Sequence, residues 1–390
     1  PVAQRGTVAS ITVVLFFLSV LAQELSHSVM ALSKGIPVRG ITLFIFGGVS
    51  RLDREPNRPI IEFVVTLVGP LMSIALAVIL GGVWCLLGRG NSSLEVVLVL
   101  LAWPNLDFGV FNLVQGDGPT VGNAISAHPG IEMVSFTGST RVGKILMEQC
   151  AATVKKTSME LGGNAPFIVF DDADIDAAVA GALASKYRNA GQTCICSNRI
   201  LVQDGIYDAF AARFAAEVQQ FRLGDGRDSD ATMGPLITRQ ACDKVTALVD
   251  DALSKGASAI TGGRRASIGE HFFEPTVLRD ATPTMRVFQE EIFGPVAPLF
   301  RFEDEQQAIA LANDTNYGLA AYFYTQNLNR VWRVAEALEY GIIGINEGVT
   351  SSEMAPFGGM KESGIGREGS KYGIDDFVEI KYMLMGGLGK

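Results

Sequence analysis

Apolar residues are arranged in two different ways along the chain, and the change falls near residue 109. Before that point they form long unbroken runs: residues 63–87 are 25 consecutive uncharged residues, residues 8–22 form a shorter run, and a third begins at Val96. About 20 apolar residues cross the hydrocarbon core of a bilayer. The pattern predicts membrane helices at 63–87 and 8–22. For 8–22 a signal peptide is the alternative, disfavoured because no small-residue cleavage site follows.

After residue 109, short β-rich runs alternate with amphipathic segments. The apolar runs predict strands near residues 134–138, 167–170, 199–203, 297–302, 320–325 and 341–347. Helical spacing of apolar residues predicts helices near 174–190, 207–221 and 330–341. Strands alternating with helices are typical of α/β domains. We therefore expect an α/β fold in this part of the chain.

The charged residues divide at the same place. The first 115 residues hold seven of the 32 Lys and Arg and six of the 41 Asp and Glu, which leaves 25 basic and 35 acidic residues after the junction. An acidic surface keeps a protein soluble and argues against a nucleic-acid partner, which would require basic patches. The five cysteines have irregular spacing and no CxxC pair. They indicate no disulfide framework and fit a reducing compartment.

A polar motif, QELSH, follows the first apolar run and contains Glu24 and His27. In the HExxH motif two histidines one helical turn apart bind zinc, and the glutamate polarises the bound water. The motif, the segment GIPVRGITLFIFGGVSRL and the later VGP resemble site-2-protease-like membrane metalloproteases. That resemblance implies Glu24 as general base and His27 as one zinc ligand.

The zinc ligands of this motif are incomplete. Gln23 replaces the first histidine, His27 is the only histidine before His128, and the family's aspartate ligand has no counterpart. Catalytic zinc needs three protein ligands. We therefore interpret residues 1–108 as a membrane-spanning fragment with a degenerate motif and expect no zinc; a working protease is the alternative.

Two glycine-containing segments, FTGSTRVG and GDGPTVG, stand near the start of the α/β region. In the first, a strand ending at Phe136 turns through Gly138 and Ser139 into a helix. Backbone N–H groups at a helix N-terminus can hold a phosphate, although a Ser there is more often only a cap. The glycines of GDGPTVG lack GxGxxG spacing, and we interpret that segment as a plain turn.

The segment NAGQTCICSNR places Cys194 on a small-residue loop at the end of a helix. A nucleophilic cysteine needs access and a lowered pKa, which a loop beside a helix end can provide. A buried inert thiol is the alternative, but Gly191 before it favours a functional loop. We assign Cys196 to packing, with reversible oxidation as the alternative.

The segment MELGGNAPF places Glu160 at the end of an apolar strand, just before Gly162 and Gly163. A carboxyl group held against apolar surface has a raised pKa and can act as a general base near neutral pH. A surface glutamate at a turn is the alternative. Cysteine, glutamate and a phosphate-binding turn together indicate an oxidoreductase with a covalent intermediate.

Five motifs, FTGST, MELGGNAPF, NAGQTCICSNR, EEIFGPV and APFGGMKESGIGREGSKYG, occur in this order. Together they resemble the aldehyde dehydrogenase superfamily, in particular the succinate-semialdehyde dehydrogenases, from residue 109 to the end. The resemblance implies a truncated Rossmann-like cofactor domain at 109–170, a catalytic domain at 171–375 and an oligomerisation strand at 376–390. It also implies NAD or NADP as cofactor and a small carboxylated aldehyde as substrate.

The same resemblance implies a role for each matching residue. Cys194 would attack the aldehyde, and Glu160 would activate the water that hydrolyses the thioester. Cofactor contacts would come from Gly138, Ser139, Glu291 and Phe293. The distal carboxylate of the substrate would meet Arg188 and Ser351, and a guanidinium fork suits a planar carboxylate.

Parts of the family pattern have no counterpart in the chain. The first strands of the cofactor domain, the Pro-Trp-Asn segment whose Asn completes the oxyanion hole and the Lys that grips the adenosine ribose are absent. Losing one oxyanion donor typically lowers the rate about 100- to 1,000-fold.

Three hypotheses follow for the chain: an aldehyde dehydrogenase impaired by truncation, a degenerate metalloprotease fragment, or a chimeric non-enzymatic module tethered to the membrane. We expect a membrane location for the first region with the dehydrogenase part cytoplasmic. If the fusion is artefactual, the protein is cytoplasmic. A homo-oligomer would form through the C-terminal strand.

Overall fold

The computed structural model describes residues 21–22, 25–44, 47–52, 68, 72, 75, 112 and 114–387. The chain divides into two compact units, Pro1–Gln115 and Gly116–Lys390. In the first unit, residues 25–33 form a helix, and β1 (Val38–Phe44) pairs with β2 (Gly47–Leu52) in an antiparallel hairpin.

The predicted membrane helices fall almost wholly outside the described residues, and so does Glu24. No helix in the described part of the chain has the length and apolar content that crossing a bilayer requires. His27 lies half-buried on the helix at 25–33. Within the described ranges, no group of three or more His, Cys, Asp or Glu side chains could hold a metal ion.

A seven-stranded sheet forms the centre of the second unit, in the order β12-β11-β5-β6-β9-β8-β7. All neighbours pair in parallel except β7 and β8. The strands are β5 (Ala165–Val169), β6 (Ser197–Gln203), β7 (Ser258–Thr261), β8 (Thr276–Ala281), β9 (Val296–Phe302), β11 (Ala320–Tyr324) and β12 (Ile342–Ile345). Every residue of β5 and β11 is buried, as expected for central strands covered on both faces.

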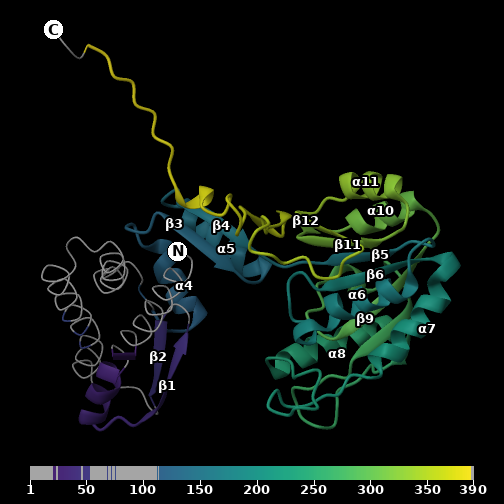
Figure 1. The fold of residues 1–390 in the computed structure, drawn as a ribbon, viewed down its shortest axis with the longest axis horizontal. Coiled ribbons are helices and arrows are strands. Elements are labelled where there is room, and N and C mark those ends of the chain that lie inside the picture. The colour runs from purple at the N-terminus through teal and green to yellow at the C-terminus, as the bar shows by residue number, and fades with distance from the viewer. Residues whose placement is uncertain are drawn as a thin grey trace, which may run out of the picture. The chain divides into compact units, whose positions relative to one another are not determined.

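Helices connect and cover these strands (Figure 1). Helices α6 and α7 pack against each other and contact β6, whereas α10 and α11 pack together and α10 contacts β5. The helices are α6 (Ile175–Tyr187), α7 (Tyr207–Val218), α8 (Arg239–Ser254), α9 (Arg286–Gln289), α10 (Glu305–Asn313) and α11 (Leu328–Ala337), with short 3-10 turns η2 (Arg188–Gly191), η3 (Asp204–Ile206) and η4 (Asp375–Phe377). The predicted strands and helices of this unit are confirmed.

A second sheet contains three strands in the order β14-β4-β3. Strand β3 (Met133–Thr137) pairs in parallel with β4 (Lys156–Glu160), and β14 (Gly364–Ile365) pairs with β4 in the antiparallel sense. Helices α4 (Gly118–Ala127) and α5 (Thr140–Ala151) contact each other, and α5 contacts both parallel strands. Strand β10 (Tyr317–Gly318) pairs with β13 (Met360–Lys361) in a separate antiparallel ladder of two residues, and β13 comes shortly before β14 in the chain.

The interpretation of GDGPTVG as a plain turn is wrong. Helix α4 begins at Gly118, and the Asp117 carboxylate accepts a 2.9 Å hydrogen bond from the Thr120 N–H. An Asp N-cap followed by a proline in the first turn is a standard helix start, because proline has no N–H to satisfy there. The sequence carried this signal, and a search for glycine spacing missed it.

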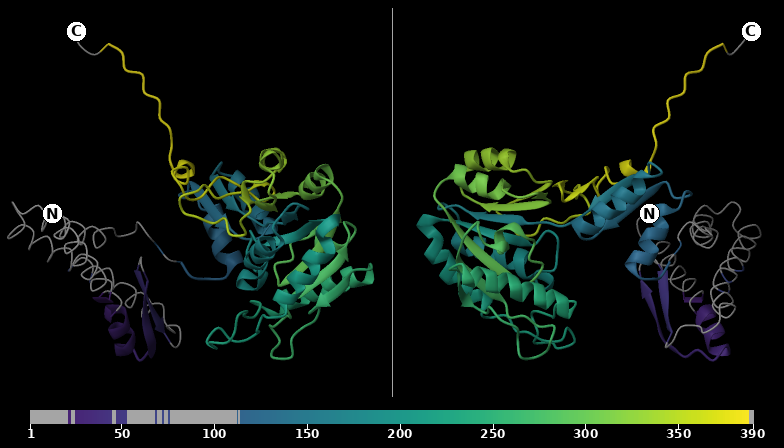
Figure 2. Two further views of the ribbon diagram at one scale, coloured as in Figure 1. Left: turned by 45° about the vertical axis from the view of Figure 1, so that its right-hand side comes forward. Right: turned by 180° about the vertical axis from the view of Figure 1, so that it is seen from behind.

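The C-terminal residues 378–387 are extended, and no strand is assigned to them. In Figure 2 this segment, coloured yellow, runs away from the rest of its unit in both views. Its apolar side chains are exposed, from 46% for Val378 to 98% for Ile380. A strand formed by this segment within an oligomer therefore stays a prediction.

Candidate active site

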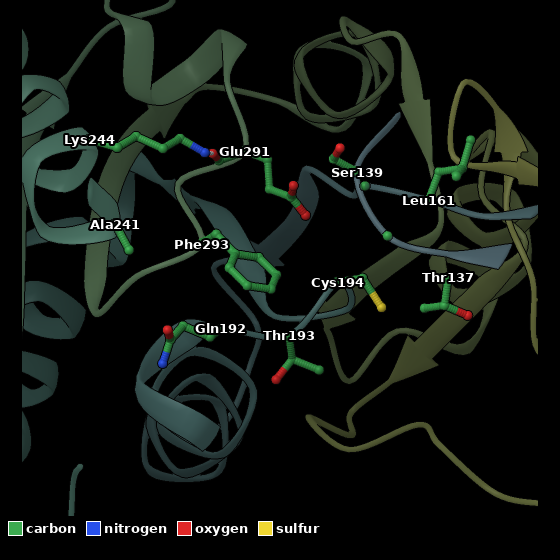
Figure 3. Close-up of a pocket in the computed structure, with 12 residues that line it drawn as sticks. Thr137, Ser139, Leu161, Gln192, Thr193, Cys194, Ala241, Lys244, Glu291 and Phe293 are labelled. Atoms are coloured by element: carbon green, nitrogen blue, oxygen red, sulfur yellow. Dashed lines mark hydrogen bonds between the residues drawn. The ribbon is translucent and has the colours of Figure 1, made fainter. Parts of the chain in front are cut away.

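A cavity of about 570 Å³ lies between the two sheets of the second unit. The small sheet contributes the carboxyl ends of β3 and β4, and the large sheet contributes the loops that lead into β6 and β9. Figure 3 shows the Phe293 ring and the Glu291 carboxylate in the space that Cys194 borders. The lining residues are Thr137, Gly138, Ser139, Leu161, Gly162, Gln192, Thr193, Cys194, Ala241, Lys244, Glu291 and Phe293.

The loop that carries Cys194 has a constrained backbone. Helix α6 ends at Tyr187, and Asn189 and Ala190 then take left-handed conformations with φ of 51° and 55°. Gly191 follows with φ of 74°, and a Cβ atom there would lie 2.2 Å from the Gly294 carbonyl oxygen. Only glycine allows this approach. The loop is therefore fixed against the segment that precedes β9 and presents Cys194 just before β6.

The expected low pKa of Cys194 is wrong for this arrangement. Burial raises the pKa of the half-exposed thiol to about 11, and the carboxylates of Glu291 and Glu160 add to the effect. The thiolate is disfavoured because it would lose water and face two negative charges. The thiol is therefore protonated at neutral pH in this conformation.

Glu160 is the last residue of β4, as predicted, and its side chain is only 3% exposed. Its main-chain carbonyl accepts a 2.9 Å hydrogen bond from the Gly138 N–H, whereas its carboxylate oxygen Oε2 has no hydrogen-bond partner. Burial, helped by the Glu368 carboxylate and opposed by Arg367, raises the pKa of Glu160 to about 7. The alternative of a surface glutamate is excluded. Leu161, the next residue, lines the cavity.

Glu291 is held by hydrogen bonds to its side chain and its main chain. The Gly163 N–H donates to Oε1 at 2.9 Å, and the Lys244 ammonium donates to the main-chain carbonyl at 2.7 Å. Burial raises the pKa of Glu291, and the Gly163 bond, Lys244 and Lys186 oppose this rise. The second oxygen, Oε2, lies 3.0 Å from the position that a Cβ on Gly162 would take. A side chain at residue 162 would therefore crowd this carboxylate.

Ser139 caps α5, as the local sequence predicted. Its hydroxyl accepts from the Val142 N–H at 3.4 Å, and both Gly138 and Ser139 line the cavity. The N-terminus of this 12-residue helix therefore points its partial positive charge toward the cavity.

Arg188 and Ser351 are brought together from distant parts of the chain. The Arg188 Nη1 donates to the Ser351 hydroxyl at 3.5 Å. Both residues are exposed, and neither lines the cavity that contains Cys194. The structure thus pairs these two predicted residues outside the lining of that cavity, with Arg188 at the start of the turn that leads to Cys194.

Two lysines near the site were not singled out from the sequence. Lys244 lines the cavity, and Lys186 is 1% exposed near Cys196 and Glu291. Burial lowers the pKa of Lys186 to about 8. Helical spacing could have revealed Lys186, because it follows the buried Ala178 and Ala182 at intervals of four.

The cavity fits the reactive end of a nicotinamide cofactor. One oxygen of Glu291 is already bonded to Gly163, and the other lies beside Gly162, so that this carboxylate at the cavity wall offers an acceptor of the kind a ribose hydroxyl needs. The Phe293 ring offers an apolar surface, and the α5 N-terminus suits a phosphate. These residues come from three separate segments of the chain and converge without a metal ligand set among the described residues.

Comparison with known proteins agrees with this geometry. Residues 60–383 match the sequence model of the Aldehyde dehydrogenase family. The chain belongs to the aldehyde dehydrogenase family. Residues 11–89 also match the model of Peptidase family M50, so the two matches overlap between residues 60 and 89. The dehydrogenase match therefore begins earlier than the motifs after residue 109 indicated.

Individual relatives of this aldehyde dehydrogenase family member are similar over more than two thirds of the chain. The chain is 59% identical over 278 residues to the NADP(+) succinate-semialdehyde dehydrogenase of Escherichia coli (strain K12), covering 71% of this chain and 58% of that protein. It is 57% identical over 280 residues to the 3-sulfolactaldehyde dehydrogenase of Pseudomonas putida, covering 72% and 58%.

The fold agrees with solved structures of the aldehyde dehydrogenase family. The crystal structure of succinate-semialdehyde dehydrogenase from Burkholderia pseudomallei superposes with a TM-score of 0.70 and 56% identity, covering 75% of this chain and 61% of that one. The predicted α/β fold is confirmed. The chain spans less than two thirds of the length of these relatives.

Proposed function

We propose that the second unit oxidises a small anionic aldehyde to its carboxylate through a thioester on Cys194, with NAD or NADP as the oxidant. The convergence of Cys194, Glu291 and Ser139 on one cavity, with Glu160 beside its wall, is the observation that carries the proposal. Relatives named for succinate semialdehyde and 3-sulfolactaldehyde support an aldehyde with an acidic group at its far end.

The chemistry of the chain's own residues begins with transfer of the Cys194 proton to solvent water. The thiolate sulfur attacks the aldehyde carbon and forms a C–S bond, leaving the negative charge on the former carbonyl oxygen. Oxidation of this adduct to a thioester on Cys194 requires a hydride acceptor, which a nicotinamide cofactor would supply when bound. Gly138, Ser139, Glu291 and Phe293 would hold the cofactor.

Hydrolysis of the thioester is assigned to Glu160. The ionised carboxylate takes a proton from water, the water oxygen attacks the thioester carbonyl, and the carbon–sulfur bond breaks to return the Cys194 thiolate. A pKa of about 7 lets this group exchange protons near neutral pH. Arg188 and Ser351 would bind the distal anionic group of the substrate, because the guanidinium and the hydroxyl already meet at 3.5 Å.

The proposal is tested without a cofactor by acylating the full chain with 4-nitrophenyl acetate. We expect a burst of one equivalent of 4-nitrophenolate and an acetyl group on Cys194, identified by peptide mass spectrometry. Cys194→Ser should abolish the burst, whereas Cys242→Ser, a change at a fully buried thiol, should leave it intact. A burst that persists in the Cys194 variant would contradict the proposal.

The match of residues 11–89 to Peptidase family M50 and the apolar runs support a second part of the proposal. Residues 1–108 form a membrane-spanning unit with a degenerate Glu24 and His27 motif, and the dehydrogenase part, in three domains at 109–170, 171–375 and 376–390, lies in the cytoplasm. Extraction of membranes with alkaline carbonate should leave the full chain in the pellet, and release into the supernatant would exclude this location.

The exposed apolar side chains of residues 378–387 support a homo-oligomer built through the C-terminal segment. Removing residues 380–390 should lower the mass measured by light scattering. An unchanged mass would assign any assembly to another surface.

A further inference from the structure

Two buried asparagines connect the loop of Cys194 to the segment of Glu291. Asn198 lies in β6, four residues after Cys194, and Asn164 directly precedes β5. Their side chains are 3% and 1% exposed, and the Asn198 amide donates to the Asn164 Oδ1 at 2.6 Å. Buried amides that satisfy each other in this way fix the relative position of the segments that carry them.

The Asn198 side chain also binds the main chain on both sides of Glu291. Its Nδ2 donates to the Glu290 carbonyl at 3.0 Å, and its Oδ1 accepts from the Ile292 N–H at 3.0 Å. This two-point contact fixes the backbone of the residue between them, much as a neighbouring strand would. Asn164 extends the contact upstream, because its Nδ2 donates to the Phe288 carbonyl at 2.9 Å.

We propose that Asn198, supported by Asn164, is a positioning residue that holds the Glu291 carboxylate at a fixed place relative to Cys194. The inference rests on the proposed roles of Cys194 and Glu291. The Gly163 N–H bond to Glu291 Oε1 fixes the side chain, and the asparagine pair fixes the backbone from which it projects. A displaced Glu291 would change both the electrostatic environment of the Cys194 thiol and the proposed binding site of the cofactor ribose.

The pKa of the Cys194 thiol depends on the position of Glu291. Titratable groups that act on Cys194 are Glu291, Glu160 and Cys196, and Glu291 has the larger of the two carboxylate effects that raise the pKa of Cys194. Groups facing Glu291 are Lys244, Lys186 and Tyr317. A change that moves Glu291 away therefore increases the thiolate fraction of Cys194 at a given pH.

The test is a double-mutant cycle on the full chain, with iodoacetamide as probe. The rate of Cys194 alkylation is followed by peptide mass spectrometry from pH 7 to pH 10. We expect Asn198→Ala and Glu291→Gln each to raise the rate at pH 8 by about threefold to tenfold, since the thiolate fraction changes tenfold for each unit of pKa. Adding Asn198→Ala to Glu291→Gln should have no further effect.

Asn313→Ala is the matched control. The Asn313 Nδ2 donates to the Ala337 carbonyl at 2.8 Å, and its Oδ1 accepts from the Glu339 N–H at 3.0 Å. Like Asn198, it hydrogen-bonds the main chain on both sides of one residue, here Leu338, but it does not line the cavity. The control should lower the melting temperature and leave the alkylation profile unchanged. If Asn198→Ala does not fold, Asn198→Leu, which is similar in size and uncharged, loses the same hydrogen bonds and should shift the profile in the same direction.

The outcomes separate this inference from the proposed function. An Asn198→Ala effect that persists in full in the Glu291→Gln background would overturn the inference, as would an unshifted profile in Asn198→Ala. Either result would leave the proposed function standing, because that function is tested separately by the acylation of Cys194 with 4-nitrophenyl acetate. Loss of that acylation in the unmutated chain would remove the proposed function instead.

Discussion

A Cβ atom on Gly163 would lie 2.1 Å from the carbonyl oxygen of Cys194. The loop after β4 and the loop before β6 are thus in direct backbone contact, although 30 residues separate them in the chain. The same glycine donates its N–H to Glu291. One residue without a side chain therefore sets the spacing between the thiol and the carboxylate.

We expect Gly163→Ala to displace the Cys194 loop, because the added methyl group overlaps backbone and not a flexible side chain. Overpacking of this kind costs about 1–3 kcal/mol. Urea unfolding should show this loss, and the 4-nitrophenyl acetate burst should fall with it. Gly226→Ala is the control, since no atom lies within 4 Å of its Cβ position. Equal stability of the two variants would argue against the close contact.

Replacing Glu160 should separate acylation from hydrolysis. Glu160→Gln keeps the size of the side chain and removes the base, so the 4-nitrophenolate burst should remain while steady turnover falls about 100-fold or more. In the unmutated chain, turnover should rise with pH through a midpoint near 7, because burial raises the pKa of Glu160 to about 7 and only the ionised form accepts a proton. Glu148→Gln, a change at an exposed residue of α5, should leave both phases unchanged.

Lys186 should make stability depend on pH in the alkaline range. Burial lowers its pKa from 10.5 to about 8 in the folded chain, so the unfolded chain binds more protons between these values and stability rises with pH there. Lys186→Met should therefore be more stable than the unmutated chain at pH 7, with the difference disappearing above pH 10.5. Chemical unfolding at both pH values measures this. Lys371→Met, at an exposed position, should show no such pH dependence.

Arg188 should make the site bind anionic aldehydes more tightly than neutral ones. Succinate semialdehyde should protect Cys194 from alkylation at lower concentration than butanal does. Arg188→Gln should remove that difference by weakening protection by succinate semialdehyde at least tenfold while leaving butanal unchanged, because only the anion uses the guanidinium. Arg227→Gln, a surface change in a different loop, serves as control. Equal losses for both aldehydes would assign Arg188 a structural role.

Local chemistry in the sequence determined the elements of the second unit. Strand and helix positions followed from apolar spacing, the start of α5 from Ser139, and the end of β4 from the two glycines after Glu160. The raised pKa of Glu160 was also predictable, because an apolar strand end was expected to bury it. These properties depend on neighbours within a few residues.

Other properties depended on residues that are distant in the chain. The pKa of Cys194 was predicted to be low from its loop, and it is raised because the fold buries the thiol and brings Glu291 and Glu160 toward it from other segments. The Asn164 and Asn198 contact with residues 288–292 has no local signature either, since each asparagine alone resembles an ordinary polar residue beside a strand.

The sequence by itself therefore determined the family, the elements and the candidate chemical groups, because motif spacing and apolar periodicity are local. The tertiary structure decided how those groups affect one another. The cavity forms where the carboxyl ends of β3 and β4 meet the loops before β6 and β9, and burial and charge at that junction come from all four segments together. Electrostatic effects and close backbone contacts act through space, so only the folded arrangement fixes their sign and size.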